Sequence, residues 1–373
     1  MKKDQDGYNM GIEASLYTNS NRDTKVPPFR LIGSKYNNLE NIRFVINNEN
    51  ISCNTFFDAF SGSASVGAFF KKDYNIISND ILYFSYILQR GLITLNHTPS
   101  FSNIEISSNK ENNVIRVLDY LNHLPITEGF IYKHYTPASL IYDGIERKYF
   151  SEYNGGKIDT IRNKIEEWFN DSQINEDEYY YLLTSLLYAV QKVSNISGTY
   201  GAYNKFWDPR SKRDIALKPI QVITSNNHHI AYNSNIFHII DKINTDIVYI
   251  DPPYNSRQYI DNYHLLETIA KNDNPIIKGK TGIRAYSSNE KSSFCSVISV
   301  RKEFKNLLNL VNARTVLISY NSNGILKKDE IINIIESSKF RFVSVYEFAY
   351  RRFKSNQKNA NETLFEYIFV GEI

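Results

Sequence analysis

The 373-residue sequence has few cysteines, no long apolar run and little net charge, and each scarcity excludes a class of protein. Its two cysteines, Cys53 and Cys295, lack metal-like spacing, so we expect neither a disulfide framework nor a metal site. No apolar run approaches membrane-spanning length and no apolar segment follows the charged N-terminus, which predicts a soluble cytoplasmic protein without membrane contact. A net charge of +3 is too small to indicate a nucleic-acid partner, so any basic surface must be local.

Apolar side chains are plentiful: 42% of the residues are hydrophobic, which argues against general disorder. A chain of this length can bury one large core or two domains, and an insertion in a single α/β domain fits equally well. Strands and helices alternate regularly up to residue 96 and again from residue 225. Between residues 97 and 224 this alternation gives way to polar sequence and then helices.

The stretch around which the chain is organised is Asp251-Pro252-Pro253-Tyr254, which follows the apolar run 247–250. That run is short, β-branched and aromatic, so it predicts a buried strand. Two consecutive prolines end the strand because neither has an N–H to donate to a sheet. Asp251 and Tyr254 are therefore expected in a stiff loop at the carboxyl end of a strand, where open α/β sheets bind ligands.

Such a loop suits the chemistry of an exocyclic amino group. Asp251 and the carbonyl of Pro252 offer two acceptors for its two N–H donors, and Tyr254 offers a flat face for its ring. An aromatic amine is a poor nucleophile because its lone pair is delocalised. Two accepted hydrogen bonds draw the nitrogen toward tetrahedral geometry, and the carboxylate stabilises the positive charge that develops during attack. A strand that simply ends in a proline turn is the alternative.

A second strand-and-turn unit, residues 55–67, favours a nucleoside-containing cofactor. An apolar strand runs into small residues and then a helix, whose N-terminus presents free N–H groups. Its glycines, Gly62 and Gly67, have the spacing of a P-loop, but the lysine and the serine or threonine that a P-loop requires after them are absent. This disfavours binding of a nucleoside triphosphate. The next predicted strand, over 74–79, ends at Asp80, the position at which a doubly wound fold places an acid on ribose hydroxyls.

The N-terminal segment, residues 1–28, is polar and is expected to be a flexible arm. Beyond it, Gly33-Ser34-Lys35 forms a turn before an amphipathic helix. Lys35 is a candidate partner for an anionic carboxylate, and an N-capped surface helix is the alternative.

Basic and aromatic residues gather in three places that are candidates for DNA contact: around residues 192–207, just after Tyr254 at Arg257, and between the last two predicted strands. Residues 176–193 predict one long helix, and residues 194–207 after it interleave glycines, aromatics and amides. These aromatics either stack on bases or pack within a hairpin, and the pattern does not separate the two. The strands over 341–347 and 364–370 predict an antiparallel edge pair with a basic loop between them. The candidate DNA-binding residues are Lys192, Tyr200, Tyr203, Lys205, Arg257, Arg351 and Arg352.

Together these segments resemble the N6-adenine DNA methyltransferases of the alpha arrangement, the DNA adenine methylase family. The family's Gly-Ser-Lys motif matches residues 33–35, and its Asp-x-Phe-x-Gly-x-Gly loop matches residues 58–64, with Ala64 in place of the second glycine. The catalytic motif matches in full at residues 251–254. The stretch 255–268 is similar to the methylases of FokI-like type IIS restriction systems.

The resemblance implies a Rossmann-like, S-adenosylmethionine-dependent methyltransferase fold with a mixed seven-stranded sheet and an antiparallel edge pair. It implies a catalytic domain of residues 29–96 and 225–373, with residues 97–224 as a mainly helical target-recognition insertion. The implied partners are double-stranded DNA and a cognate restriction endonuclease, with residence at the nucleoid through DNA binding. The implied catalytic residues are Asp251, Pro252, Pro253 and Tyr254. The implied cofactor-binding residues are Lys35, Asp58, Phe60, Gly62, Ser63, Asp80, Asn235 and Asp251.

Other acceptors of the same methyl group stay open, because the chemistry of Asp251 and Pro252 does not distinguish N6 of adenine in DNA from N4 of cytosine, adenine in RNA or a protein amide. A DNA-binding relative without catalysis is a further alternative, which the intact Asp251 and Tyr254 disfavour.

Overall fold

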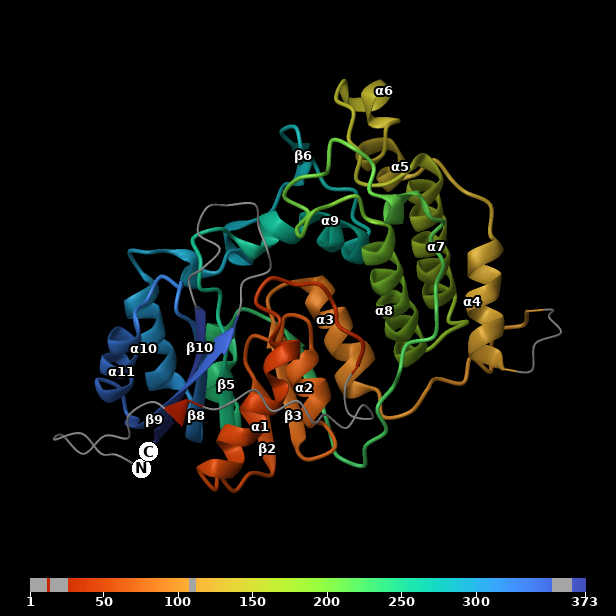
Figure 1. Ribbon diagram of the computed structural model, residues 1–373. Coiled ribbons are helices and arrows are strands. Elements are labelled where there is room, and N and C mark those ends of the chain that lie inside the picture. The colour runs from red at the N-terminus through yellow and green to blue at the C-terminus, as the bar shows by residue number, and fades with distance from the viewer. Residues whose placement is uncertain (1–11, 14–25, 107–111, 351–363) are drawn as a thin grey trace.

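The computed structural model describes residues 12–13, 26–106, 112–350 and 364–373. One twisted sheet with helices on both faces forms the left and centre of Figure 1, and a group of helices extends from it on the right. The strands are β1 (Ile12–Glu13), β2 (Thr55–Asp58), β3 (Asn75–Asp80), β4 (Ile230–Asn233), β5 (Asn244–Ile250), β8 (Asn312–Asn321), β9 (Arg341–Tyr350) and β10 (Leu364–Glu372).

The sheet has the order β1-β9-β10-β8-β5-β2-β3-β4. Strands β8, β5, β2, β3 and β4 run parallel, whereas β10 runs antiparallel to both β8 and β9. These seven strands form the mixed sheet that the sequence predicts, including its antiparallel pair. An eighth strand, the two-residue β1, pairs parallel with β9 from within the segment expected to be a flexible arm, and nothing in the sequence predicts it.

Alternate residues of the central strands face two separate cores, as the two-residue period of a strand requires. In β5, Ile247 and Tyr249 enter one core and Val248 and Ile250 enter the other, which explains why the whole run is apolar. The first core is covered by α1 (Leu39–Asn48), α2 (Ser65–Phe70) and α3 (Tyr83–Gln89). The second is covered by α10 (Val300–Leu310) and α11 (Lys328–Glu336).

The helical part comprises α4 (Asn113–His123), α5 (Phe130–Tyr135), α6 (Ser139–Asp143), α7 (Glu152–Asn170) and α8 (Glu176–Val193). Helix α8 has the predicted bounds, and Asn175 caps it through a capping box with Glu178. The sequence of residues 263–270 favours a helix, and these residues lie in α9 (Tyr259–Lys271), between the sheet and the helical part in Figure 1. Within the described ranges, no helix is long and apolar enough to cross a bilayer.

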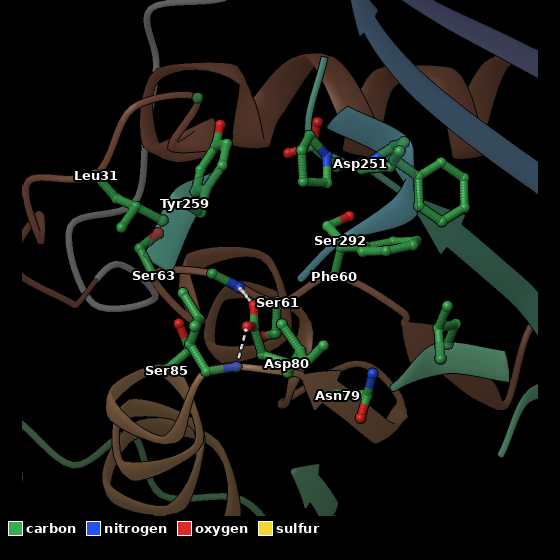
Figure 2. A pocket seen from close by; sticks show the side chains of 18 of the residues that line it. Leu31, Phe60, Ser61, Ser63, Asn79, Asp80, Ser85, Asp251, Tyr259 and Ser292 are labelled. Carbon is green, nitrogen blue, oxygen red and sulfur yellow. Dashed lines mark hydrogen bonds between the residues drawn. The ribbon is translucent and has the colours of Figure 1, made fainter. Parts of the chain in front are cut away.

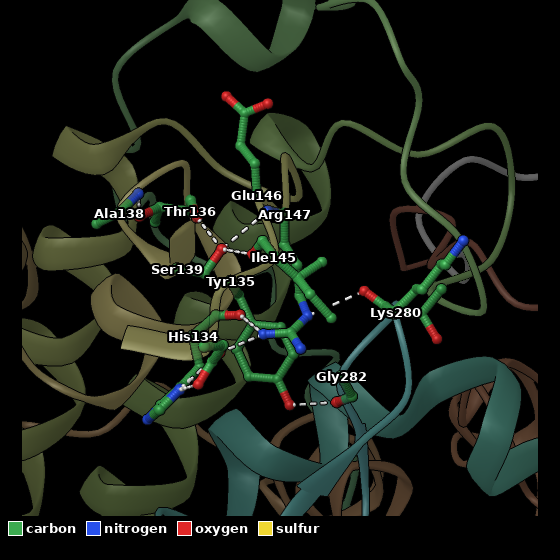
Figure 3. Close-up of polar contacts among 12 residues, drawn as sticks. His134, Tyr135, Thr136, Ala138, Ser139, Ile145, Glu146, Arg147, Lys280 and Gly282 are labelled. Carbon is green, nitrogen blue, oxygen red and sulfur yellow. Dashed lines mark hydrogen bonds and ion pairs between the residues drawn. The ribbon is translucent and has the colours of Figure 1, made fainter. Parts of the chain in front are cut away.

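Buried arginines fasten the helical part to the rest of the chain. Arg162 of α7 donates to the carbonyls of Ile269 and Ala270 at the end of α9, both at 3.0 Å. Arg147 donates through Nε to the Lys280 carbonyl at 3.0 Å, in the hairpin that joins β6 (Ile277–Lys278) to β7 (Ile283–Arg284). Figure 3 shows this cluster, in which Asp143 also pairs with Arg147. Such bonds fix the position of the helices relative to the sheet.

Two local predictions are wrong. The apolar residues 236–240 favour a helix by their sequence, but they form two 3₁₀ turns, Ile236–His238 and Ile240–Lys242, because the chain must reverse within a few residues to enter β5. Residues 194–207 contain no hairpin, although their aromatics do pack within the protein.

Candidate active site

The carboxyl ends of the parallel strands surround one cavity. Asp58 ends β2, Asp80 ends β3, and Asp251 follows β5, so that the parallel pairing of these strands brings the three carboxylates to the same edge. Figure 2 shows the labelled side chains of Phe60, Asp80 and Asp251 around this cavity. Gly62 and Asp251 therefore share one pocket although 189 positions separate them in the sequence.

The turn after β2 is held by the acid that ends β3. Asp80 accepts the backbone N–H of Gly62 at 2.8 Å and that of Leu82 at 2.9 Å (Figure 2). Burial raises the pKa of Asp80 to about 6, against the lowering effect of these two N–H donors. The two elements predicted to bind the same nucleoside are thus joined directly.

Ala64 occupies a position that favours glycine. Its φ of 60° lies in the left-handed region, as does the φ of 50° at Gly62 two residues earlier. The backbone keeps the conformation that a second glycine would take most easily, and Ala64 adopts it with its side chain fully buried. Replacement of the second glycine therefore leaves the turn intact.

Asp58 is 1% exposed and its two oxygens differ in their partners. Oδ2 accepts the Ser61 hydroxyl at 3.0 Å, whereas Oδ1 has no hydrogen-bond partner among the described residues. Burial, with a smaller contribution from the nearby Asp251 charge, raises the pKa of Asp58 to about 7 against the lowering effect of the Ser61 hydroxyl. A buried oxygen with no donor is suited to an incoming ammonium or hydroxyl group.

Lys35 lies between two carboxylates. Its Nζ is 2.8 Å from Oδ1 of Asp251 and 2.8 Å from Oε1 of Glu366, and it donates to the Gly33 carbonyl at 3.2 Å. The two carboxylate oxygens and the carbonyl thus surround the ammonium, which is hydrogen-bonded to the Gly33 carbonyl and ion-paired with both acids. Burial tends to lower the pKa of Lys35, but Asp251 and Glu366 outweigh it and the pKa is raised well above its ordinary value.

Burial also raises the pKa of Asp251, to about 7. The Lys35 charge lowers this pKa and the Glu366 charge raises it, so the two neighbours act in opposite directions. Above that pH the group is a carboxylate, which accepts hydrogen bonds and stabilises nearby positive charge. Below it, the carboxyl is neutral and loses part of this ability.

The Tyr254 ring is fixed on several sides. It meets the Tyr320 ring edge-on at a centroid distance of 6.2 Å, and Nζ of Lys35 lies 5.7 Å from the centroid of the Tyr254 ring. The Tyr254 carbonyl accepts the backbone N–H of Ile325 at 3.0 Å. A ring held in this way keeps its orientation before any ligand arrives.

A second groove meets the pocket at Tyr254. The two cavities share residues 31–35 and Tyr254. The groove, but not the pocket, is also lined by Lys192, Asn321 and Glu366. A ligand that enters from the groove would meet Tyr254 and Lys35, and Lys35 is paired with Asp251 of the pocket. This arrangement suits two reactants that meet at Asp251.

The sequence matches, over residues 31–334, a family model described as D12 class N6 adenine-specific DNA methyltransferase. The chain belongs to that family. It is 45% identical to the type II methyltransferase M.FokI of Planomicrobium okeanokoites, over 91% of this chain and 52% of that protein. It is 35% identical to the modification methylase StsI of Streptococcus sanguinis, over 91% of this chain and 51% of that protein.

Another relative, the type II methyltransferase M.NlaIII of Neisseria lactamica, is 36% identical over 86% of this chain and 92% of its own length. The chain thus spans about half the length of M.FokI and StsI and nearly all of M.NlaIII. The D12 family is the DNA adenine methylase resemblance that the motifs indicate, and it is confirmed.

The residues expected to serve a D12 enzyme all come together. Asn235 lines the pocket while its side chain accepts the Phe237 N–H at 3.1 Å, and Phe60 packs edge-on against Phe294. The binding roles of these residues stay predictions, and the partners of Lys35 differ from the ligand carboxylate expected for it. The predicted residues that line the pocket are Lys35, Asp58, Phe60, Gly62, Ser63, Asp80, Asn235, Asp251, Pro252, Pro253 and Tyr254.

Among the predicted DNA contacts, Tyr200 is wrong. It is 1% exposed, its hydroxyl lies 2.9 Å from that of Ser194, and its carbonyl accepts the Tyr149 hydroxyl at 2.8 Å, so it belongs to the core. Tyr203 is half-buried, and its hydroxyl donates to the Glu146 carbonyl. Lys192, Lys205 and Arg257 are exposed, whereas Arg351 and Arg352 lie outside the described residues.

Sequence reasoning missed several residues of the pocket and of the groove beside it. Glu366 is the most informative, because a glutamate among the apolar residues of the last predicted strand was a signal of a buried charge. Tyr259, Phe237 and Phe294 also line the cavity, and their sequence context carries no comparable signal.

Proposed function

We propose that this protein transfers a methyl group from S-adenosylmethionine to N6 of an adenine that is flipped out of double-stranded DNA. The observation that carries the proposal is that Tyr254 and Lys35 line both the pocket and the groove, while Asp251 lines the pocket in contact with Lys35. One cavity can hold the donor while the groove admits the base. Membership of the D12 family supports adenine as the acceptor.

The residues of the pocket fit S-adenosylmethionine. The free Oδ1 of Asp58 suits the ammonium of its amino acid part, and Asp80, beside the Gly62 turn, suits its ribose hydroxyls. Phe60 and Phe294 offer apolar faces. When bound, this cofactor supplies a methyl carbon activated by a sulfonium.

At the acceptor side, Asp251 and the Pro252 carbonyl would accept the two N–H groups of the adenine amine. The amine nitrogen would accept the methyl group as the sulfonium becomes a neutral thioether, and the positive charge gained by the nitrogen would leave as a proton to solvent. The ionised Asp251 stabilises that charge as it develops. Tyr254 would stack on the flipped base and replace roughly 1–3 kcal/mol of the stacking lost from the duplex.

We assign residues 29–96 and 225–373 to catalysis and the helical residues 97–224 to target recognition. Exposed Lys192, Lys205 and Arg257 would contact phosphates, with Lys192 at the edge of the groove itself. The names of the relatives, type II methyltransferases and modification methylases, support a role in modification beside a cognate restriction endonuclease.

The test is to incubate the purified protein with labelled S-adenosylmethionine and either duplex DNA or RNA, and to identify the labelled nucleosides by mass spectrometry. We expect N6-methyladenine from DNA. N4-methylcytosine, label in RNA alone, or no label at all would each contradict the proposal. Mapping the modified adenines in DNA from expressing cells then gives the recognition sequence.

A further inference from the structure

We propose that Glu366 is a positioning residue that acts through Lys35 to keep the acceptor corner of the pocket negatively charged. The inference rests on the proposed function, in which Asp251 faces a cationic donor and an amine that becomes cationic. Neither the sequence motifs nor the family description assigns a role to this glutamate.

The contacts of Lys35 carry the argument. The lysine is 4% exposed, and it divides its charge between Glu366 and Asp251 at equal distances of 2.8 Å. The side chain of Glu366 is 6% exposed, and the residue lies in β10, opposite Asn321 of β8. Because the ammonium lies equally close to both acids, Glu366 competes with Asp251 for the charge of Lys35.

The charges of the three groups give the consequence. Lys35 and Asp251 alone would form a neutral pair, whose field on a nearby cation is weak. With ionised Glu366, the same corner holds one positive and two negative charges and is negative overall. The positive charge moves from the sulfur of the donor to the amine during the reaction, so a negative corner stabilises it throughout.

A purely structural role explains the glutamate less well. Ile368 and Val370 follow Glu366 at alternate positions of β10, and both are buried in the core that α1 covers. A buried charge at such a position is costly, and an ion triad is often no more stable than well-packed apolar residues. The cost is understandable if the charge itself serves the reaction.

Other groups near Asp251 do not provide this charge at neutral pH. Tyr249 and Tyr259 face it, and burial raises the pKa of both well above the ordinary value, so they stay neutral. Tyr254 follows in the same loop. Among the described residues, Asp58 is a further carboxylate near Asp251, and it lies toward the turn that would hold the donor.

The first experiment needs no DNA. It measures by calorimetry the affinity of the full chain for S-adenosylmethionine and for S-adenosylhomocysteine, which lacks the methyl group and the sulfonium charge. In Glu366→Gln we expect affinity for the charged ligand to fall about tenfold relative to the neutral one. Glu347→Gln, which removes a carboxylate paired with Lys328 on the adjacent strand β9, is the matched control. An unchanged ratio in Glu366→Gln would overturn the proposal.

The second experiment follows the single-turnover rate against pH. Because Glu366 raises the pKa of Asp251, its removal should move the acid limb of the profile to lower pH while the plateau falls about tenfold. Glu366→Asp, which keeps the charge, should have a smaller effect on both. A lower plateau with an unmoved midpoint would mean a structural role only, and would contradict the proposal.

The two arms separate this inference from the proposed function. If the wild-type protein binds both ligands but methylates no DNA, the proposed function fails while the affinity ratio still tests Glu366. If the wild type methylates DNA and the ratio does not change in Glu366→Gln, the positioning role alone fails.

Discussion

A Cβ atom on Gly33 would lie 3.1 Å from the hydroxyl oxygen of Tyr254. The φ of Gly33 is +78°, so a side chain there is strained even apart from this contact. We expect Gly33→Ala to displace the Tyr254 ring and to lower the methylation rate per bound DNA by about tenfold or more. Fluorescence of 2-aminopurine at the target position would report the loss of the stacked base. Gly198→Ala, with no atom within 4 Å of the added carbon, should behave as wild type.

Removal of the Asp251 carboxylate should abolish methyl transfer and leave cofactor binding largely intact. Asp251→Asn retains the shape but loses the charge, and Asp251→Ala loses both. We expect each to lower the single-turnover rate at least a hundredfold, as loss of a preorganised electrostatic contact does. Calorimetric titration with S-adenosylmethionine is the companion measurement. Equal loss of binding and turnover in a folded variant would refute the assigned role.

The rate should rise with pH through about 7, because the pKa of Asp251 is raised to that value and the ionised form accepts the amine. Single-turnover rates between pH 5 and 9, with binding saturated at each pH, would define the midpoint. A midpoint near 4, the ordinary value for aspartate, would contradict the burial of this group.

Ionised Asp58 should lower the stability of the folded protein, although it favours binding of the cofactor. Its folded pKa of about 7 is above the unfolded value, so the folded protein holds the proton more tightly. The stability that this provides is present below about pH 4 and is lost as the pH rises toward 7. Asp58→Asn should therefore raise the free energy of unfolding at pH 8 by about 1–3 kcal/mol, and by less at pH 5. Urea unfolding at both pH values checks this, and cofactor affinity should fall in the same variant.

The exposed Lys192 and the buried Tyr200 should respond differently to truncation. Lys192→Ala should lower the slope of log affinity for DNA against log salt by about 1, as loss of one phosphate contact does. Lys302→Ala, an exposed lysine of α10 that does not line the groove, is its control. Tyr200→Ala should instead cost about 3 kcal/mol of stability, since it leaves a cavity in the core. A salt slope unchanged by Lys192→Ala would exclude it from the interface.

The sequence predicts the parts of the fold whose signals are local. Residues 247–250 form a buried strand because both of its faces are apolar, and the prolines after it mark where it ends. Strand β1 has only two residues and depends on a partner more than 300 positions away, so no local pattern predicts it. Tyr200 was misassigned because glycine-rich aromatic sequence has the same composition whether its rings face solvent or the core.

In the site, too, local sequence signals predict some residues, while others depend on contacts between distant parts of the chain. Asp58, Asp80 and Asp251 were predictable because each ends a strand, and strand ends are visible in sequence. The contact between Lys35 and Glu366 joins residues 331 positions apart, and only the pairing of β10 with β8 brings them together.

The place of β10 in the middle of the sheet has a consequence for synthesis on the ribosome. This strand is the last described element of the sequence, yet it lies between β8 and β9 and contributes Glu366. A nascent chain that has not yet emerged to residue 372 has two open strand edges and an unfinished pocket. Under the proposed function, chains that end before Leu364 are expected to be inert and aggregation-prone rather than enzymes of altered specificity.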